Sequence, residues 1–252
     1  MNLAGKVILV TGGSRGIGRA CVLDAVARGA RVVFCSRHDG PERRQTEATA
    51  AAVGGADAAI GLTTDVSDET SVTRLFEEAR QRFGPLHGVV NNAAVSRESL
   101  LVSTTTEDWD AVIAVNLTGG FLVAREALRT FLEEGRGGRI VSIGTVSLFG
   151  ISGNASYATG KGGLAGLTRQ INRQHAGDGI VAAMVIPGYV ETTLSAGISE
   201  SARQSLIDGC PMRRPGSPEE TASVVSFLLS DASAGIETRT LFASGGLREA
   251  PP

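Results

Sequence analysis

The stretch KVILVTGGSRGIG, residues 6–18, decides the fold of this chain. It begins with a short apolar and β-branched run, which is typical of a strand buried on both faces, and it ends in a glycine turn. Residues 16–29 then carry apolar side chains at helical spacing, and Arg31 to Cys35 forms a second apolar run. These segments predict a strand–helix–strand unit whose crossover is right-handed.

The same alternation of strands and helices continues along the chain. It predicts a doubly wound parallel sheet with helices on both faces, a Rossmann-type α/β fold, in a single domain over residues 1–252. Residues 189–216 show no clear strand or strong helix and are the expected substrate loop, although an ordinary surface excursion has the same pattern. The further strands are expected at residues 58–63, 88–90, 139–143, 180–186 and 241–243, and the helices at 71–83, 109–132 (interrupted in pattern at Gly119-Gly120), 157–176 and 218–230.

The composition excludes several classes of protein. The chain has 252 residues, with 24 Lys and Arg against 26 Asp and Glu, so it lacks the basic excess of a nucleic-acid binder. Cys21, Cys35 and Cys210 are too few and too scattered for a disulfide framework or a metal site. We expect no membrane span and no signal peptide, and hence a cytoplasmic protein.

The glycine turn predicts a dinucleotide site. Gly12 permits the tight turn, Gly16 lets the backbone approach a pyrophosphate, and Gly18 lets the helix pack closely on the strand. Free N–H groups at the helix N-terminus would then bind the anion. A plain glycine-rich turn is the alternative. The predicted loop contacts are Gly12, Ser14, Arg15, Gly16, Ile17 and Gly18.

The end of the second strand favours NADP(H) over NAD. An acidic residue commonly follows this strand where NAD binds, but here no acid occurs before Asp39. Arg15 and Arg37 instead offer two guanidinium groups, which suit a phosphate because they donate hydrogen bonds in a planar fork. Two ordinary exposed arginines would give the same pattern.

Tyr157 and Lys161 stand four residues apart in a predicted helix, so they share one face. An adjacent ammonium lowers the pKa of a phenol, which makes the phenol a usable general acid or base. This spacing alone is also common on surface helices, so it needs support from the rest of the chain.

Six motifs occur in one order: TGGSRGIG, DVSD, NNAA, Asn116, Tyr157 with Lys161, and Pro187-Gly188. Together they resemble the classical short-chain dehydrogenase/reductase family over residues 3–247, and within it the bacterial 3-oxoacyl-[acyl-carrier-protein] reductases and related ketoreductases. The resemblance implies that Tyr157 exchanges a proton with the substrate oxygen and that Lys161 lowers the tyrosine pKa and binds the nicotinamide ribose. It implies that Asn116 holds a water of the proton relay. The remaining cofactor contacts that it implies are Asp65, Val66, Asn92, Ala93, Pro187, Gly188, Val190 and Thr192.

The chain departs from the family pattern at the catalytic serine. That serine stands about thirteen residues before the tyrosine, where this chain has Gly144. We expect Thr145 to supply the hydroxyl, with Ser147 and then Ser142 as alternatives, and a slow enzyme without this hydroxyl is a further possibility. Residues 237–239 and Ser244-Gly245-Gly246 also depart from the pattern of a segment that supports tetramer packing in the family, so the expected homo-oligomer is a tetramer or a dimer.

Specificity is expected in residues 94–101, 146–153 and 189–216. Their apolar side chains suit an acyl chain or a ring ketone: Leu148, Phe149, Ile151, Tyr189, Leu194, Ile198, Leu206, Ile207 and Met212. A carrier-protein substrate would need basic residues near the entrance, and the candidates are Arg136, Arg139, Arg169 and Arg173.

The leading hypothesis is NADPH-dependent reduction of a small-molecule or carrier-bound ketone, such as a 3-oxoacyl thioester or a biosynthetic ketone. One alternative is an alcohol dehydrogenase that oxidises a sugar, a steroid or a cyclic alcohol. The other is an NADP-binding sensor without turnover.

Overall fold

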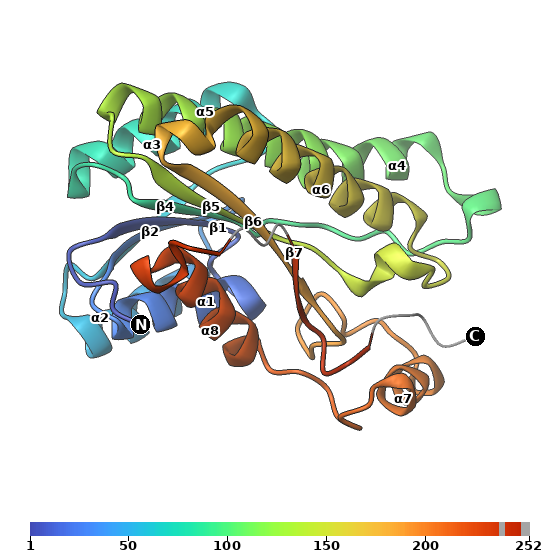
Figure 1. Ribbon diagram of the computed structural model, residues 1–252. Coiled ribbons are helices and arrows are strands. Elements are labelled where there is room, and N and C mark those ends of the chain that lie inside the picture. The colour runs from blue at the N-terminus through green and yellow to red at the C-terminus, as the bar shows by residue number, and fades with distance from the viewer. Residues whose placement is uncertain (237–239, 248–252) are drawn as a thin grey trace.

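A parallel sheet of seven strands forms the centre of the molecule (Figure 1). The computed structural model describes residues 1–236 and 240–247, so the departure noted at 237–239 lies outside the described residues. The strand order is β3-β2-β1-β4-β5-β6-β7, and all pairs are parallel. The strands are β1 (Val7–Thr11), β2 (Arg31–Ser36), β3 (Ala59–Thr63), β4 (Gly88–Asn91), β5 (Gly138–Ile143), β6 (Ile180–Pro187) and β7 (Thr240–Ala243).

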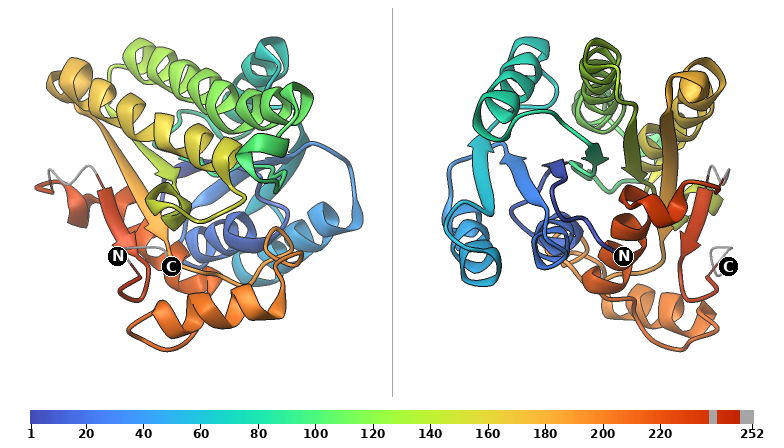
Figure 2. Two further views of the ribbon diagram at one scale, coloured as in Figure 1. Left: turned by 90° about the vertical axis from the view of Figure 1, so that its right-hand side faces the viewer. Right: turned by 60° about the vertical axis from the view of Figure 1, so that its left-hand side comes forward.

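Helices cover both faces of this sheet, as the alternating pattern predicts. Helices α1 (Gly16–Ala27), α2 (Pro41–Gly54) and α8 (Pro218–Leu229) lie on one face (Figure 1). The other face carries α3 (Glu69–Phe83), α4 (Thr106–Ile113), α5 (Gly120–Glu134) and α6 (Ala155–His175). Figure 2 shows the same two layers from other sides.

The central strand β1 explains why its sequence is apolar throughout. Ile8 and Val10 pack into the core beneath α1 and α8, whereas Val7 and Leu9 pack into the core beneath α3 and α5. All four side chains are buried, because helices cover both faces of the strand.

Two helices differ from the sequence predictions. Helix α2 was not predicted, because the side chains that it buries are only Thr46 and Ala50, which make a weak apolar stripe. Helix α7 (Glu200–Gly209) lies within the expected substrate loop and buries only Leu206. The prediction of no strong helix in residues 189–216 is therefore wrong at these ten residues. Helix α7 stands to one side of both helix layers (Figures 1 and 2).

The long helix expected at 109–132 is interrupted where its pattern breaks. A π-helical turn, Ala114–Gly119, joins α4 to α5. A side chain at Gly120 would come within 2.6 Å of Leu164 on α6, so the helices approach closely here. By length and composition the run from Thr106 to Glu134 could cross a membrane, a test that core helices of soluble proteins also pass. The sequence predicted a long helix here but no run apolar enough to pass this test.

Candidate active site

A cavity of about 480 Å³ opens at the carboxyl ends of the central strands. It lies where β1 and β4 pair and the strand order changes direction, which is the usual ligand site in open parallel sheets. Its volume is within the range of small-molecule and cofactor sites. The sequence-predicted residues that line it are Gly12, Ser14, Arg15, Gly16, Ile17, Gly18, Arg37, Asp65, Val66, Asn92, Ala93, Thr145, Ser147, Tyr157, Lys161, Pro187, Gly188, Val190 and Thr192.

The glycine loop brings the N-terminus of α1 to the cavity. Arg15 precedes the helix in extended conformation, no side chain caps the first N–H groups, and the first turn holds no acid. A side chain at Gly18 would come within 2.1 Å of the Gly12 carbonyl oxygen, so only glycine lets the helix pack here. This cradle of free N–H groups fits the pyrophosphate of a dinucleotide.

Thr11, which the sequence analysis did not single out, fastens the glycine loop to the segment after β4. Its hydroxyl oxygen accepts hydrogen bonds from the backbone N–H groups of Asn92 and Ala93, each at 3.0 Å. The Asn92 side chain in turn donates to the carbonyl oxygens of Thr11 and Gly12, at 2.9 and 3.2 Å. A buried threonine at a strand end carries no chemical signal in the sequence, because its partners come from a distant strand.

At the opposite end from the tyrosine, the cavity is cationic. Neither Arg15 nor Arg37 forms an ion pair in the part of the chain that the structure describes, although the Arg37 side chain donates to His38 at 3.1 Å. Asp39 is already paired with Arg43 and Arg44, at 2.7 and 2.9 Å. Two guanidinium groups therefore remain available to a phosphate on the cofactor.

Asp65 has an ordered carboxylate beside this cationic end. It accepts hydrogen bonds from the hydroxyl and the backbone N–H of Ser67, at 2.6 and 2.9 Å. These bonds lower the pKa of Asp65, and the charge of Arg37 contributes. The Asp65 carboxylate is thus ionised and fixed in place at neutral pH.

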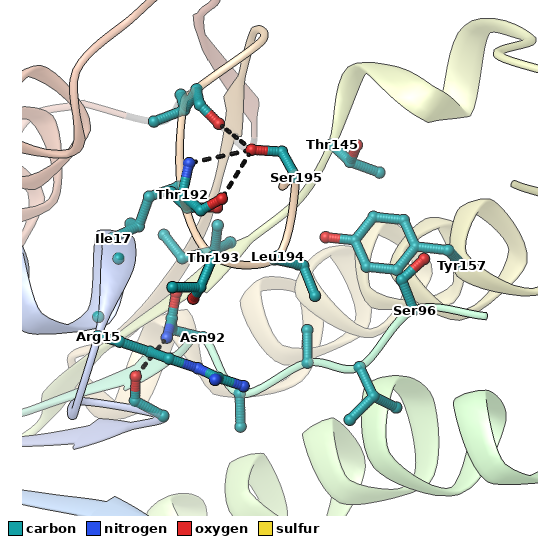
Figure 3. Close-up of a pocket in the computed structure, with 18 of the residues that line it drawn as sticks. Arg15, Ile17, Asn92, Ser96, Thr145, Tyr157, Thr192, Thr193, Leu194 and Ser195 are labelled. Carbon is teal, nitrogen blue, oxygen red and sulfur yellow. Dashed lines mark hydrogen bonds between the residues drawn. The ribbon is translucent and has the colours of Figure 1, made fainter. Parts of the chain in front are cut away.

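Helix α6 carries Tyr157 and Lys161 into the other end of the cavity. Figure 3 shows the Tyr157 phenol pointing into the cavity beside Thr145 and Ser96, with Arg15 and Ile17 at the far end. Burial lowers the pKa of Lys161 to about 8 and raises the pKa of Tyr157 to about 12. Burial thus shifts the Tyr157 pKa in the direction opposite to the expected lowering, and the effect of Lys161 on the phenol stays a prediction.

The ammonium of Lys161 has no hydrogen-bond or ion-pair partner among the described residues, although the residue is only 1% exposed. A buried cation without a partner is costly. Ligand hydroxyls in the cavity would provide the acceptors that the folded chain does not.

Two of the three candidate hydroxyls reach the cavity. Thr145 and Ser147 line it, whereas Ser142 is buried within β5 and does not. The Thr145 hydroxyl donates to the Ser147 hydroxyl at 3.1 Å. Two hydroxyls are therefore present in this part of the site, and which of them acts on the substrate stays a prediction.

Asn116 is the predicted site residue that does not line the cavity. It lies in the π-helical turn, and its side-chain amide exchanges two hydrogen bonds with the Val95 backbone, at 2.9 and 3.0 Å. Its amide therefore holds the segment after β4 in place. The expected water at Asn116 stays a prediction.

The segment after β6 covers the cavity between the glycine loop and Tyr157. The Ser195 hydroxyl accepts from the Thr192 N–H at 2.9 Å and lies 3.0 Å from the Val190 carbonyl, which closes a tight loop (Figure 3). Ile151, Tyr189, Leu194, Ile198 and Leu206 line the cavity as expected of specificity residues. The other expected residues do not line it: Leu148, Phe149, Ile207 and Met212, and the basic Arg136, Arg139, Arg169 and Arg173.

This chain is similar in sequence to known proteins over nearly its whole length. Residues 12–248 match a family model described as enoyl-(acyl carrier protein) reductase. The chain is 36% identical over 248 residues to the 3-oxoacyl-[acyl-carrier-protein] reductase FabG of Escherichia coli (strain K12), covering 98% of this chain and 99% of that protein. It is 37% identical over 249 residues to the reductase of the same name from Pseudomonas aeruginosa, with the same coverage.

Solved structures share the fold. Levodione reductase is 28% identical with a TM-score of 0.91, covering 97% of this chain and 98% of that one. A short-chain type dehydrogenase/reductase from Mycobacterium marinum is 27% identical with a TM-score of 0.92, covering 98% and 96%.

Proposed function

Because this chain belongs to the short-chain dehydrogenase/reductase family of oxidoreductases, which use a nicotinamide cofactor, we propose that it reduces a ketone to a secondary alcohol with NADPH. The observation that carries this proposal is one cavity with a glycine-lined anion cradle at one end and Tyr157 with Lys161 at the other. A bound nicotinamide would supply the hydride to the carbonyl carbon.

The protonation states of the site favour reduction at neutral pH. With a pKa of about 12, Tyr157 carries its proton and can donate it to the substrate oxygen as negative charge develops there. With a pKa of about 8, Lys161 remains mostly charged at pH 7 and would stabilise the phenolate left behind. The same groups run the reverse oxidation from the phenolate form, for which a higher pH is needed.

The substrate would enter beneath the segment after β6. The apolar side chains of Ile151, Leu194 and Ile198 line this part of the cavity, which suits an acyl chain or a ring ketone. The named relatives reduce 3-oxoacyl groups on acyl carrier protein, so a 3-oxoacyl thioester is the first substrate to test. We further propose a cytoplasmic homo-oligomer, a tetramer or a dimer, with residues 1–252 as one domain.

The Tyr157→Phe variant tests the mechanism. It should abolish NADPH oxidation with a 3-oxoacyl thioester or a small diketone, because phenylalanine cannot donate the proton, while NADPH binding measured by cofactor fluorescence stays unchanged. Turnover by this variant above about a hundredth of the wild-type rate would contradict the assigned acid, since general acid catalysis is worth roughly 10²–10⁴-fold.

A substrate panel separates the three functions. Wild-type protein is given ketones with NADPH, an enoyl thioester with NADPH, and sugar, steroid and cyclic alcohols with NADP⁺. Turnover confined to the alcohols would favour the oxidative dehydrogenase. NADPH binding without turnover of any substrate would favour the sensor.

The Arg37→Ala variant tests the choice of cofactor. The KM for NADPH should rise about tenfold or more while the KM for NADH changes little, because only NADPH carries the additional phosphate. Arg44→Ala is the matched control, since Arg44 is a nearby exposed arginine that pairs with Asp39 and does not line the cavity. Equal effects of Arg37→Ala on both cofactors would remove the argument for NADPH.

A further inference from the structure

The two hydroxyls beside Tyr157 are not equivalent. Thr145 stands at the end of the segment after β5, in extended conformation, and caps the short 3₁₀ turn Val146–Phe149. Its hydroxyl oxygen accepts the backbone N–H of Ser147 at 3.1 Å. The threonine is thus already engaged in building the local backbone, which is the ordinary role of a capping residue.

Counting protons shows which hydroxyl is left for a ligand. A hydroxyl has one proton to donate. The Thr145 proton is directed to the Ser147 oxygen at 3.1 Å. No described residue accepts the proton of Ser147, although this side chain is only 9% exposed and lines the cavity.

We propose that Ser147, rather than Thr145, donates the hydrogen bond to the carbonyl oxygen of the substrate. Thr145 is then a positioning residue, which holds Ser147 through two hydrogen bonds and polarises its hydroxyl. Hydrogen bonds in a chain strengthen one another, so a hydroxyl that accepts from Thr145 is a better donor to the substrate.

This assignment rests on the proposed function and keeps its chemistry balanced. During reduction the hydride adds to the carbonyl carbon, and the electron pair of the C=O π bond moves to oxygen. Tyr157 supplies the only transferred proton. Ser147 keeps its own proton and stabilises the charge on oxygen in the transition state, as donors in an oxyanion hole do.

The assignment places the donor closer to the tyrosine in sequence than the family serine is. Thr145 precedes Tyr157 by twelve residues, one fewer than the family serine, and Ser147 precedes it by ten. The 3₁₀ turn after Thr145 lets the chain double back, so both residues reach the same cavity.

Three variants test the division of roles. Ser147→Ala should lower kcat for ketone reduction by about 10²–10³-fold, the loss typical of one oxyanion donor, with the cofactor Kd unchanged. Thr145→Ser keeps the hydroxyl and should retain more activity than Thr145→Val. Thr145→Val removes the cap and the polarisation but leaves the donor, so its kcat should fall less than that of Ser147→Ala. Ser142→Ala is the control, because Ser142 is buried in β5 outside the cavity.

The opposite ranking, with Thr145→Val nearly inactive and Ser147→Ala close to wild type, would overturn the proposal. A second measurement does not need turnover. The infrared C=O stretch of 2,3-butanedione bound with NADP⁺ should move to higher wavenumber in Ser147→Ala and keep most of its wild-type position in Thr145→Val. The reverse result would also overturn it. Wild-type protein that binds the ketone with this shifted stretch but does not reduce it would refute the proposed function alone.

Discussion

At the scale of single residues, Tyr157 and Lys161 show what spacing predicts and what it does not. Their separation places them on one face of a helix, and the structure has both in one cavity. Spacing contains no information on burial, and burial sets both pKa values here. For the same reason, the sequence ranked Thr145 ahead of Ser147 without access to the direction of one proton, on which the roles of the two hydroxyls depend.

The chain allows a direct measurement of the Lys161 pKa, because its only lysines are Lys6 and Lys161. In protein labelled with ¹³C at lysine Cε, two signals should appear. The Lys161 signal should titrate at about pH 8, since burial disfavours its charge, while Lys6, paired with Asp231 at 2.6 Å, serves as the internal control. The kcat/KM for NADPH should fall as pH rises through the same value, because the amine form loses its charge.

A Lys161 signal that shows no titration near pH 8 would contradict the effect of burial. If the kcat/KM for NADPH stays constant across the pH range in which Lys161 titrates, the charge of Lys161 does not contribute to productive binding of NADPH.

At the scale of elements, the sequence predicted helices and strands correctly where it has a strong apolar periodicity or a glycine turn. The helix α1 and the strands β1 and β2 follow the expected boundaries within a few residues, because their apolar pattern is continuous. Helices α2 and α7 escaped prediction because each buries only one or two side chains. Their positions depend on tertiary contacts, which a local pattern does not contain.

Helix α7 is held over the cavity by an exposed ion pair. Arg203 on α7 donates to Glu191 in the segment after β6, with the Arg203 Nε at 2.8 Å from the carboxylate, and the Tyr189 phenol is a further partner. Arg203→Ala should therefore raise the ketone KM by about two- to fivefold, the range expected of an exposed pair, while the NADPH KM stays constant.

Glu200→Ala is the matched control, because Glu200 is a second, more exposed partner of Arg203 that does not line the cavity. Steady-state kinetics at low and high salt should show the Arg203 effect shrinking as salt rises. An equal rise in both KM values would mean that α7 does not act on the substrate alone.

At the scale of the whole molecule, the sequence predicted the cofactor end better than the substrate end. The glycine loop, Asp65 and Asn92 each follow a strand of a regular sheet, so the topology itself brings them together. The segment of residues 190–216 leaves the sheet and returns at neighbouring points, where Val190 bridges Gly216, and no sheet pairing within the segment fixes the position of α7. Two of the four expected specificity residues that lie outside the cavity, Ile207 and Met212, belong to this segment, whereas Leu148 and Phe149 belong to the turn after β5.

His87 links the two central strands and should make global stability pH-dependent. Its Nδ1 accepts the backbone N–H of Val7 at 3.1 Å, which requires the neutral ring. Burial first, then Lys6 and Arg136, lower the pKa of His87 below the ordinary value of 6.5. The neutral His87 ring contributes its full stabilisation when the pH is above the His87 pKa of the unfolded chain. This contribution is lost as the pH falls toward the lower His87 pKa of the folded protein.

Urea unfolding from about pH 7.5 down to about pH 5 measures this effect, with His87→Asn as the control because the asparagine Oδ1 can accept without titrating. The free energy of unfolding should fall more steeply with acidification in wild type than in His87→Asn. Parallel curves would exclude His87 as the titrating group.

The strand order has a consequence for synthesis of the chain. The first strand made, β1, ends in the middle of the sheet, and the last, β7, closes one edge only when residue 243 has formed. A growing chain on the ribosome therefore exposes the edge of β6 until β7 has been made, and such edges pair with other chains. Ribosomal pausing shortly before β7 would prolong this exposure, so the yield of soluble protein should depend on codon choice in the segment that encodes β7.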